Sequence, residues 1–249
     1  MAICCFVISP GRCGTQWIAH QLKFQLQEIA RVEHEPIHFS YAPYINSPSF
    51  PLVEQKEKIL KHLESIAHTL ESGLSYIECG FPCWRHIRWM ISELSYIDNV
   101  SFKVIQIVRE PMSNAHSLLK INAYVPPLLP HMRTKVLLSP DSPEAHFYEL
   151  LDVWHEFSPF DKCLFYCCEL YKEGEILRQQ LPEHDFLRLN FEDMFNAESM
   201  AEVMSFLQSK FHSDLFSIKL LDKYQGQVAY YQNANIHRQV LSLLKLTFG

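Results

Sequence analysis

Short apolar runs alternate along the chain with longer segments of helical periodicity. Residues 3–8 and 102–108 are dominated by apolar side chains, which is typical of strands buried on both faces of a sheet. Each run is followed by a segment in which apolar residues recur every three or four positions, as in an amphipathic helix. The pattern predicts strands at 3–8, 74–79, 102–108 and 186–190, and helices at 14–27, 52–70, 84–94, 111–119 and 198–211.

This alternation also predicts the fold class. Strands that are separated by helices pair in parallel, because each helix returns the chain to the same end of the sheet. We therefore expect an α/β fold of three layers, with a central parallel sheet and helices on both faces. The 249 residues contain no internal repeat and no clear linker, so we expect one domain, residues 1–249.

Composition narrows the range of partners. Lys and Arg number 22 against 28 Asp and Glu, so the net charge is −6 and a broad nucleic-acid-binding surface is not expected. An anionic ligand must instead meet a local basic cluster. No apolar stretch approaches the ~18 residues of a membrane helix, and the apolar start is too short for a signal peptide. We expect a cytoplasmic protein with no membrane partner; the sequence does not indicate its oligomeric state.

A proline-rich segment interrupts the second half of the chain. Five prolines fall within residues 122–143, which excludes a helix or a central strand there. We expect a long surface loop. Loops of this length often cover a binding site, so the segment is a candidate lid over a substrate, with a plain surface loop as the equal alternative.

The segment that follows the first strand has the composition of a phosphate-binding loop. Two of the seven glycines, Gly11 and Gly14, fall between this strand and the next helix. Glycine allows backbone N–H groups to turn toward a ligand, and the helix N-terminus adds partial positive charge. Arg12 adds a full charge and Thr15 a hydroxyl, although an ordinary strand–helix turn would show the same residues. Gly14 is not followed by the lysine that phosphoryl transfer from a magnesium nucleotide requires.

A second basic site follows the strand at 102–108. Arg109 stands at the strand exit, and Ser117 lies eight residues further, within the predicted helix. Ligands of parallel sheets bind at the carboxyl ends of the strands, and the forked guanidinium suits a terminal phosphate. The structural alternative is an ion pair between Arg109 and a carboxylate such as Glu110.

Together these segments resemble the sulfotransferases that use 3′-phosphoadenosine 5′-phosphosulfate (PAPS). The phosphosulfate loop of that family reads Pro-Lys/Arg-Ser-Gly-Thr-Thr-Trp, which is similar to residues 11–17. Its 3′-phosphate motif places Arg and Ser eight residues apart after a strand, as Arg109 and Ser117 stand here. A third family segment, Tyr-Glu-Asp-Leu/Met, is similar to residues 191–194.

The resemblance implies a P-loop-like fold and transfer of a sulfuryl group from PAPS to a hydroxyl or amine of a small-molecule acceptor. It implies no metal cofactor. The phosphosulfate loop would consist of Arg12, Cys13, Gly14, Thr15, Gln16 and Trp17, with Arg109 and Ser117 on the 3′-phosphate. Arg238 is the candidate for a further phosphate contact near the C-terminus. Cys13 and Gln16 replace hydroxyl residues of the family, and Phe191 stands where a Tyr is common, which removes one possible polar contact to adenine.

The sequence lacks the catalytic base that one branch of the family uses. Gly80 occupies the position at which the cytosolic branch carries a His. Other branches use a Glu beyond the second strand, where residues 33–38 read Glu-His-Glu-Pro-Ile-His. Glu35 is our first candidate for the base, His34 and His38 are its rivals, and Glu78 follows. The alternative is that these side chains only solvate a loop.

Three other interpretations remain. Residues 34–38 spell the His-Glu-x-x-His pattern of zinc proteases, but Pro36 disfavours the helix that this pattern needs, and we expect no metal site. A P-loop kinase that acts on a small molecule is the second alternative. A catalytically inactive, nucleotide-binding relative is the third. The acidic balance of the chain would tolerate a cationic acceptor.

Overall fold

The four predicted strands and a fifth that the sequence analysis missed, Ala30–His34, form one parallel sheet. In the computed structural model, which describes residues 1–36, 53–80, 87–126, 138–142 and 145–216, the strand order is β2-β3-β1-β4-β5 and every pairing is parallel. The strands are β1 (Ala2–Ile8), β2 (Ala30–His34), β3 (Ser75–Cys79), β4 (Val100–Val108) and β5 (Phe186–Asn190). The α-helices of the described residues are α1 (Thr15–Leu26), α2 (Val53–Glu71), α3 (Ile87–Leu94), α4 (Pro111–Leu119), α6 (Pro159–Gln180) and α7 (Ala197–Phe206).

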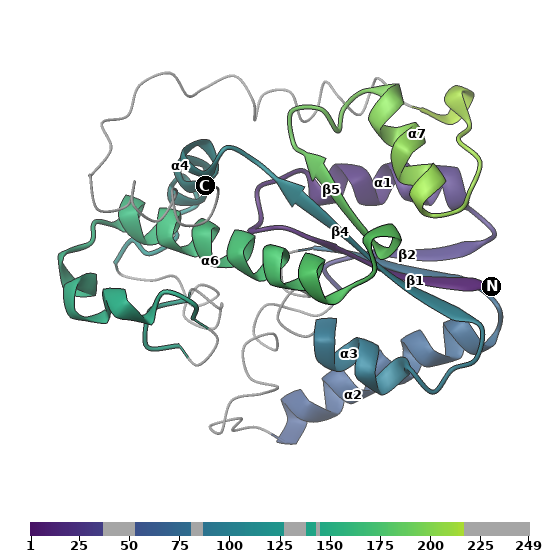
Figure 1. Cartoon of the computed structure of the whole chain (residues 1–249), viewed down its shortest axis with the longest axis horizontal. Helices are drawn as coiled ribbons and strands as arrows, with labels where there is room; N and C mark the ends of the chain where they lie inside the picture. Colours follow the sequence, from purple (N-terminus) through teal and green to yellow (C-terminus); the bar gives the residue numbers. More distant parts are fainter. Residues whose placement is uncertain (37–52, 81–86, 127–137, 143–144, 217–249) are drawn as a thin grey trace.

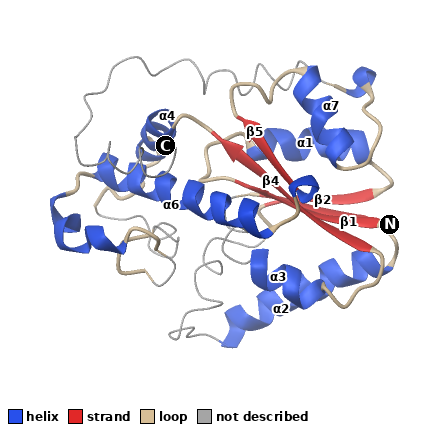
Figure 2. Ribbon diagram, viewed as in Figure 1, coloured by secondary structure: helices blue, strands red, loops and turns tan. Residues whose placement is uncertain are grey.

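Helices cover both faces of this sheet, as predicted. Alternate side chains of β1 enter two separate apolar cores, since successive residues of a strand point to opposite faces. Cys4 and Phe6 pack with α2, α3, α4 and α6, whereas Cys5 and Val7 pack with α1 and α7. Figure 1 shows α1 and α7 together on one side of the strands and α2 and α3 on the other, and Figure 2 shows the strands between these layers.

The element boundaries follow local sequence signals. α4 begins at Pro111, whose missing N–H costs nothing in the first turn, and the Glu110 carboxylate accepts the backbone N–H of Met112 and Ser113. β4 begins at Val100, two residues before the predicted start, and α7 ends at Phe206 instead of residue 211. Of the predicted helix at 84–94, residues 84–86 lie outside the described part.

The sequence analysis missed the longest helix, α6. Ser158 accepts the backbone N–H of Asp161 while the Asp161 carboxylate accepts the N–H of Ser158, which is a capping box, and Pro159 occupies the first turn. Glu169 of this helix is buried and accepts the backbone N–H groups of His146 and Phe147 at 2.7 and 2.8 Å. α6 therefore also fixes the chain that follows the proline-rich segment.

The proline-rich segment is less of a surface loop than predicted. Its described ends contain no helix or strand, but Ala123 and Leu138 are each only 1% exposed and belong to the core shared with α6. The Tyr124 hydroxyl donates to the Leu138 carbonyl and joins the two ends. Residues 127–137 and 143, on which the role of a lid depends, lie outside the described part.

Two adjacent strands lead to opposite faces of the sheet. β1 is followed by α1 on one face, and its neighbour β4 is followed by α4 and α6 on the other. At such a switch point the chain diverges and leaves a crevice at the carboxyl ends of the strands. The loop at 9–14 and Arg109 both lie at this place.

The described residues contain neither a membrane-spanning helix nor a cluster of metal-binding side chains. None of their helices combines the length and the apolar character needed to cross a lipid bilayer. Within the same residues, no three His, Cys, Asp or Glu side chains are grouped so as to hold a metal ion. The seven cysteines in this part of the chain are buried free thiols.

Candidate active site

The loop after β1 has the backbone of an anion-binding turn. Gly11, Arg12 and Gly14 all have positive φ, at 84°, 59° and 72°. Ser9 accepts the Gly11 N–H at 3.1 Å, and the Cys13 thiol points back to the Gly11 carbonyl at 3.3 Å. Successive residues of this kind turn peptide N–H groups toward a common concave side, where an anion binds.

Gly14 has little room for a side chain at the start of α1. A Cβ there would lie 3.2 Å from the Met194 side chain and 3.3 Å from Phe191, besides straining the positive φ. As the N-cap residue, Gly14 also lacks a side chain that could accept the first N–H groups of α1. These donors and the helix dipole favour an anion at this end of the helix.

The two predicted basic sites meet. The Arg12 Nε donates to Ser117 Oγ of α4 at 3.3 Å, and Arg109 Nη1 donates to the Arg12 carbonyl at 2.9 Å. Arg109 is only 4% exposed, and its guanidinium lies 4.4 Å above the centre of the Phe191 ring. Residues 105 positions apart in the chain thus share one site.

Arg109 is held from behind by a residue that the sequence analysis missed. The Tyr171 hydroxyl, on α6, accepts the backbone N–H of Arg109 at 3.0 Å and donates to its carbonyl at 2.7 Å. Burial raises the pKa of Tyr171 well above its usual value, so the hydroxyl keeps its proton. The sequence shows only a tyrosine in an apolar segment and carries no direct signal of this contact.

At the end of β2, His34 and Glu35 lie beside the start of α1. His34 Nε2 is 3.2 Å from Thr15 Oγ1, at the start of α1. Glu35 has a positive φ of 48°, and its N–H donates to the Cys79 carbonyl at 2.9 Å. The two side chains are 28% and 24% exposed, so both remain accessible to a ligand.

Glu35 occupies the space beside Gly80. A Cβ at Gly80 would lie 2.5 Å from the Glu35 Cγ and 3.1 Å from its backbone nitrogen. A histidine at position 80, as in one branch of the family that the sequence resembles, therefore has no room unless Glu35 moves. The Glu35 Cγ stands close to the position where that side chain would begin.

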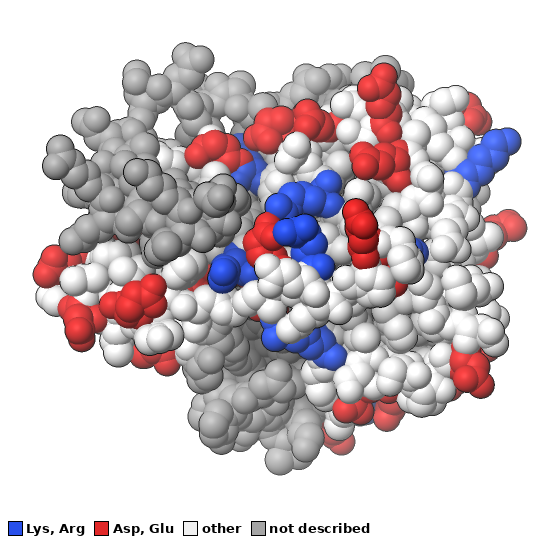
Figure 3. All heavy atoms as spheres, viewed as in Figure 1, with Lys and Arg blue, Asp and Glu red and all other residues white. Residues whose placement is uncertain are grey.

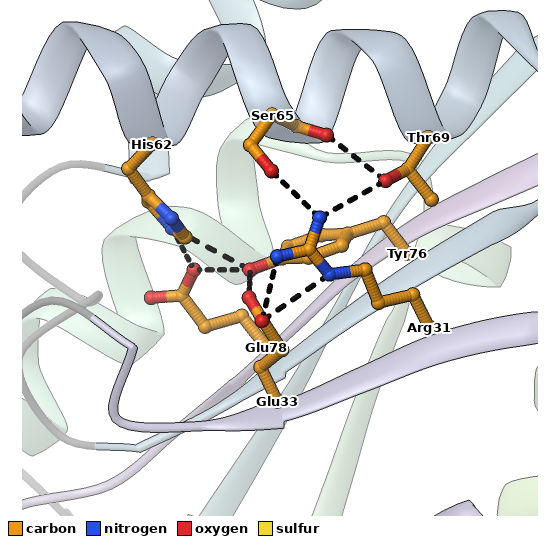
Figure 4. A network of polar contacts seen from close by, with 7 residues as sticks. All are labelled: Arg31, Glu33, His62, Ser65, Thr69, Tyr76 and Glu78. Atoms are coloured by element: carbon orange, nitrogen blue, oxygen red, sulfur yellow. Dashed lines mark hydrogen bonds and ion pairs between the residues drawn. The ribbon is translucent and has the colours of Figure 1, made fainter.

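A buried polar network supports the ends of these two strands. The Tyr76 hydroxyl lies 2.9 Å from Glu33 and 3.1 Å from Glu78, and Glu78 lies 2.9 Å from His62 of α2 (Figure 4). Arg31 donates to Glu33 at 2.7 Å and to Ser65 at 2.6 Å. These contacts join β2, β3 and α2. They involve Glu33 and Glu78, which directly precede His34 and Cys79 at the strand ends.

The network bears on the choice of the base. The His62 side chain is 12% exposed, because it packs against Glu78 of β3. The Glu78 side chain is 2% exposed and engaged with both His62 and Tyr76. Glu78 is thus a poorer candidate for the base than Glu35 or His34.

The other candidate residues of the loop differ in how far they are exposed to solvent. Gln16 is exposed, whereas Trp17 and Cys13 are fully buried. Burial raises the pKa of the Cys13 thiol to about 12, and only the backbone of Cys13 is left to face a ligand. His38 and Arg238 lie outside the described residues. The positive φ of Glu35 excludes helical geometry within the His-Glu-x-x-His pattern at that residue.

Basic residues outside the site are largely paired on the face seen in Figure 3. Lys and Arg side chains gather in front of α6 and β5 in this view, with acidic side chains among them. Arg178 and Arg188 both form ion pairs with Glu175. These two arginines therefore share one carboxylate on the surface of the protein.

The fold is that of solved sulfotransferase domains. The sulfotransferase domain from the Synechococcus PCC 7002 olefin synthase aligns over 99% of this chain and 94% of its own, with a TM-score of 0.52 and 11% identity. The sulfotransferase domain from the curacin biosynthetic pathway aligns over 99% of this chain and 97% of its own, with a TM-score of 0.53 and 12% identity. Comparisons with protein-family models and with curated proteins find no match. The predicted α/β fold is confirmed.

Replacing Tyr171 with Phe removes both of its hydrogen bonds to the buried backbone of Arg109. We expect Tyr171→Phe to lower the free energy of unfolding by about 2 kcal/mol. Chemical denaturation measures this change. Tyr148→Phe is the matched control, because Tyr148 is 72% exposed and should change stability by less than about 0.5 kcal/mol. Equal stability of the two variants would contradict the contact.

Burial, with His20 and Lys23 nearby, lowers the pKa of His34 from 6.5. His34 should therefore be neutral at pH 7, and an NMR titration should give a midpoint below pH 6.5, with His34→Gln identifying the resonances. Because the folded state disfavours the protonated ring, this residue should make the free energy of unfolding decrease as the pH falls below 6.5. A midpoint at or above 6.5 would exclude a desolvated His34.

Proposed function

We propose that this protein transfers a sulfuryl group from PAPS to a hydroxyl or amine of a small-molecule acceptor and releases adenosine 3′,5′-bisphosphate. The observation that carries the proposal is the meeting of the two arginine sites at one loop, with Arg12 on Ser117 and Arg109 on the Arg12 carbonyl. A donor with phosphate groups at both ends needs positive charge at two places. The likeness of the fold to sulfotransferase domains supports the same assignment.

In this proposal the loop stabilises the charge that develops on the leaving group. The acceptor oxygen or nitrogen forms a bond to sulfur, and the bond from sulfur to the bridging oxygen of the phosphosulfate breaks. Negative charge then grows on the phosphate. The Arg12 guanidinium and the N–H groups at the start of α1 are donors held in advance for that charge, and fixed donors of this kind usually supply the largest part of catalysis.

Glu35 is the proposed base, and its place beside Gly80 supports this choice. It accepts the proton that the acceptor loses as the new bond to sulfur forms. His34 is the alternative, since a neutral imidazole beside Thr15 could also accept a proton. The acceptor is proposed to be a small molecule, and the acidic residues at these strand ends suit a cationic one.

Two other functions make different chemical demands. A kinase would bind ATP with magnesium, and the absence of a lysine after Gly14 argues against this activity. An inactive relative would bind adenosine 3′,5′-bisphosphate and transfer nothing. Mass spectrometry of metabolite mixtures incubated with the protein and labelled PAPS tests all three, with ATP and magnesium as the parallel reaction. Label in a metabolite supports the proposal, and label transfer from ATP alone would replace it with the kinase.

Arg12→Ala should reduce turnover by at least ~100-fold, because the developing phosphate charge loses a fixed donor. The positive φ at this position adds no new strain, since arginine already bears it. Arg178→Ala is the control: it also removes one arginine charge, but from an exposed ion pair, and should keep the wild-type rate. Steady-state kinetics with PAPS measures both. A wild-type rate for Arg12→Ala would show that the loop is not the donor site.

Glu35→Gln should lower kcat by ~100-fold or more while leaving the affinity for adenosine 3′,5′-bisphosphate nearly unchanged, because only the proton acceptor is lost. Turnover and calorimetric binding together separate these effects. His34→Gln serves as the comparison, since it removes the rival base. If His34→Gln alone loses turnover, the base is His34; if both variants keep the wild-type rate, the proton goes elsewhere.

A further inference from the structure

Three buried side chains form a row along one face of α1. Trp17, Gln21 and Gln25 follow one another at intervals of four residues, which places them on the same side of a helix. Trp17 and Gln21 are 0% exposed, and Gln25 is 6% exposed. Trp17 lies two residues after Thr15, so the row starts beside the phosphate-binding loop.

The two glutamines of this row differ in their partners. Gln25 uses both atoms of its amide: it donates to the His212 carbonyl and accepts the His212 N–H, each at 2.9 Å. Within the described structure, neither atom of the Gln21 amide has a hydrogen-bond partner, and neither does the Trp17 indole N–H. Leaving a buried donor or acceptor unpaired costs free energy that an apolar residue would avoid. The fold gains nothing from these polar atoms.

Aromatic side chains surround the start of the row. The Trp17 ring lies 5.0 Å from the ring of Phe195 and 6.2 Å from that of Phe216. Phe195 in turn packs against Phe191, which lies under Arg109. Flat apolar faces beside unpaired polar atoms are the features by which proteins bind a nucleobase, through stacking and in-plane hydrogen bonds. The cluster adjoins the proposed phosphate sites.

A glutamine amide offers one donor and one acceptor side by side. The edge of adenine presents the matching pair, an amino donor next to a ring-nitrogen acceptor. The segment 212–216 that covers the row is partly exposed, and Gln25 holds it at His212. A base that stacks on Trp17 would take the place of the Phe216 ring.

We propose that Gln21 recognises the adenine of the nucleotide donor by a pair of hydrogen bonds, with Phe216 occupying the place of the base in the free protein. The assignment rests on the proposed function, because it needs a donor with an adenine base. It makes Gln21 the residue that sets base specificity, with Trp17 and its neighbours providing the apolar walls.

Calorimetric titration with two nucleotides tests this assignment. Adenosine 3′,5′-bisphosphate carries the 6-amino group, and purine riboside 3′,5′-bisphosphate lacks it. The wild-type protein should prefer the adenosine compound by on the order of tenfold. Gln21→Leu should bind both equally, and its unfolding temperature should stay the same or rise, because an unpaired buried amide is removed.

Gln25→Leu is the matched control. It makes the same substitution one turn along the helix, but it removes the two hydrogen bonds to His212, so the unfolding temperature should fall while the preference for adenosine stays. An undiminished preference in Gln21→Leu, or none in the wild-type protein, would overturn the role of Gln21. Failure of the wild-type protein to bind either nucleotide would overturn the proposed function itself.

Discussion

Two hydrogen bonds join the two halves of the candidate site, and one of them is made by Arg12 with Ser117. The buried Arg109 guanidinium donates to the carbonyl of Arg12, and Tyr171 fixes the backbone of Arg109 from the opposite side. An arginine that is 4% exposed can be retained only where its charge and donors are met, because desolvation of an unpaired charge is costly. The position of the loop after β1 therefore depends on β4 and α6 as much as on its own glycines.

Most of the sheet could be predicted because a strand that is buried on both faces appears in the sequence as a continuous apolar run. β1 and β4 are continuous apolar runs, and Pro111 marks the start of α4 directly after β4. The apolar pattern of β2 is much weaker, because it is an edge strand in which only Val32 is buried. The pattern of apolar residues accordingly did not predict a strand at Ala30–His34.

The site itself could be predicted only in part. The glycines after β1 and the spacing of Arg109 and Ser117 are local signals, and both pointed to the same edge of the sheet. The contact of Arg12 with Ser117 spans 105 positions and depends on how β1 and β4 pair. The burial of His62 is of the same kind, because His62 lies on α2 and its partner Glu78 lies on β3. No periodicity within one segment contains such information.

The side chain of Glu35, at the end of one strand, fills the space that Gly80 leaves at the end of the neighbouring strand. The two residues follow the paired ends of β2 and β3, where His34 lies opposite Cys79. With no side chain at position 80, Glu35 turns into that space through a positive φ, which costs free energy that the hydrogen bond from its N–H to Cys79 partly offsets. Restoring a side chain at position 80 would remove the reason for that turn. A glycine at one strand end and a carboxylate at the next thus form a single structural unit, and neither is interpretable from its own segment alone.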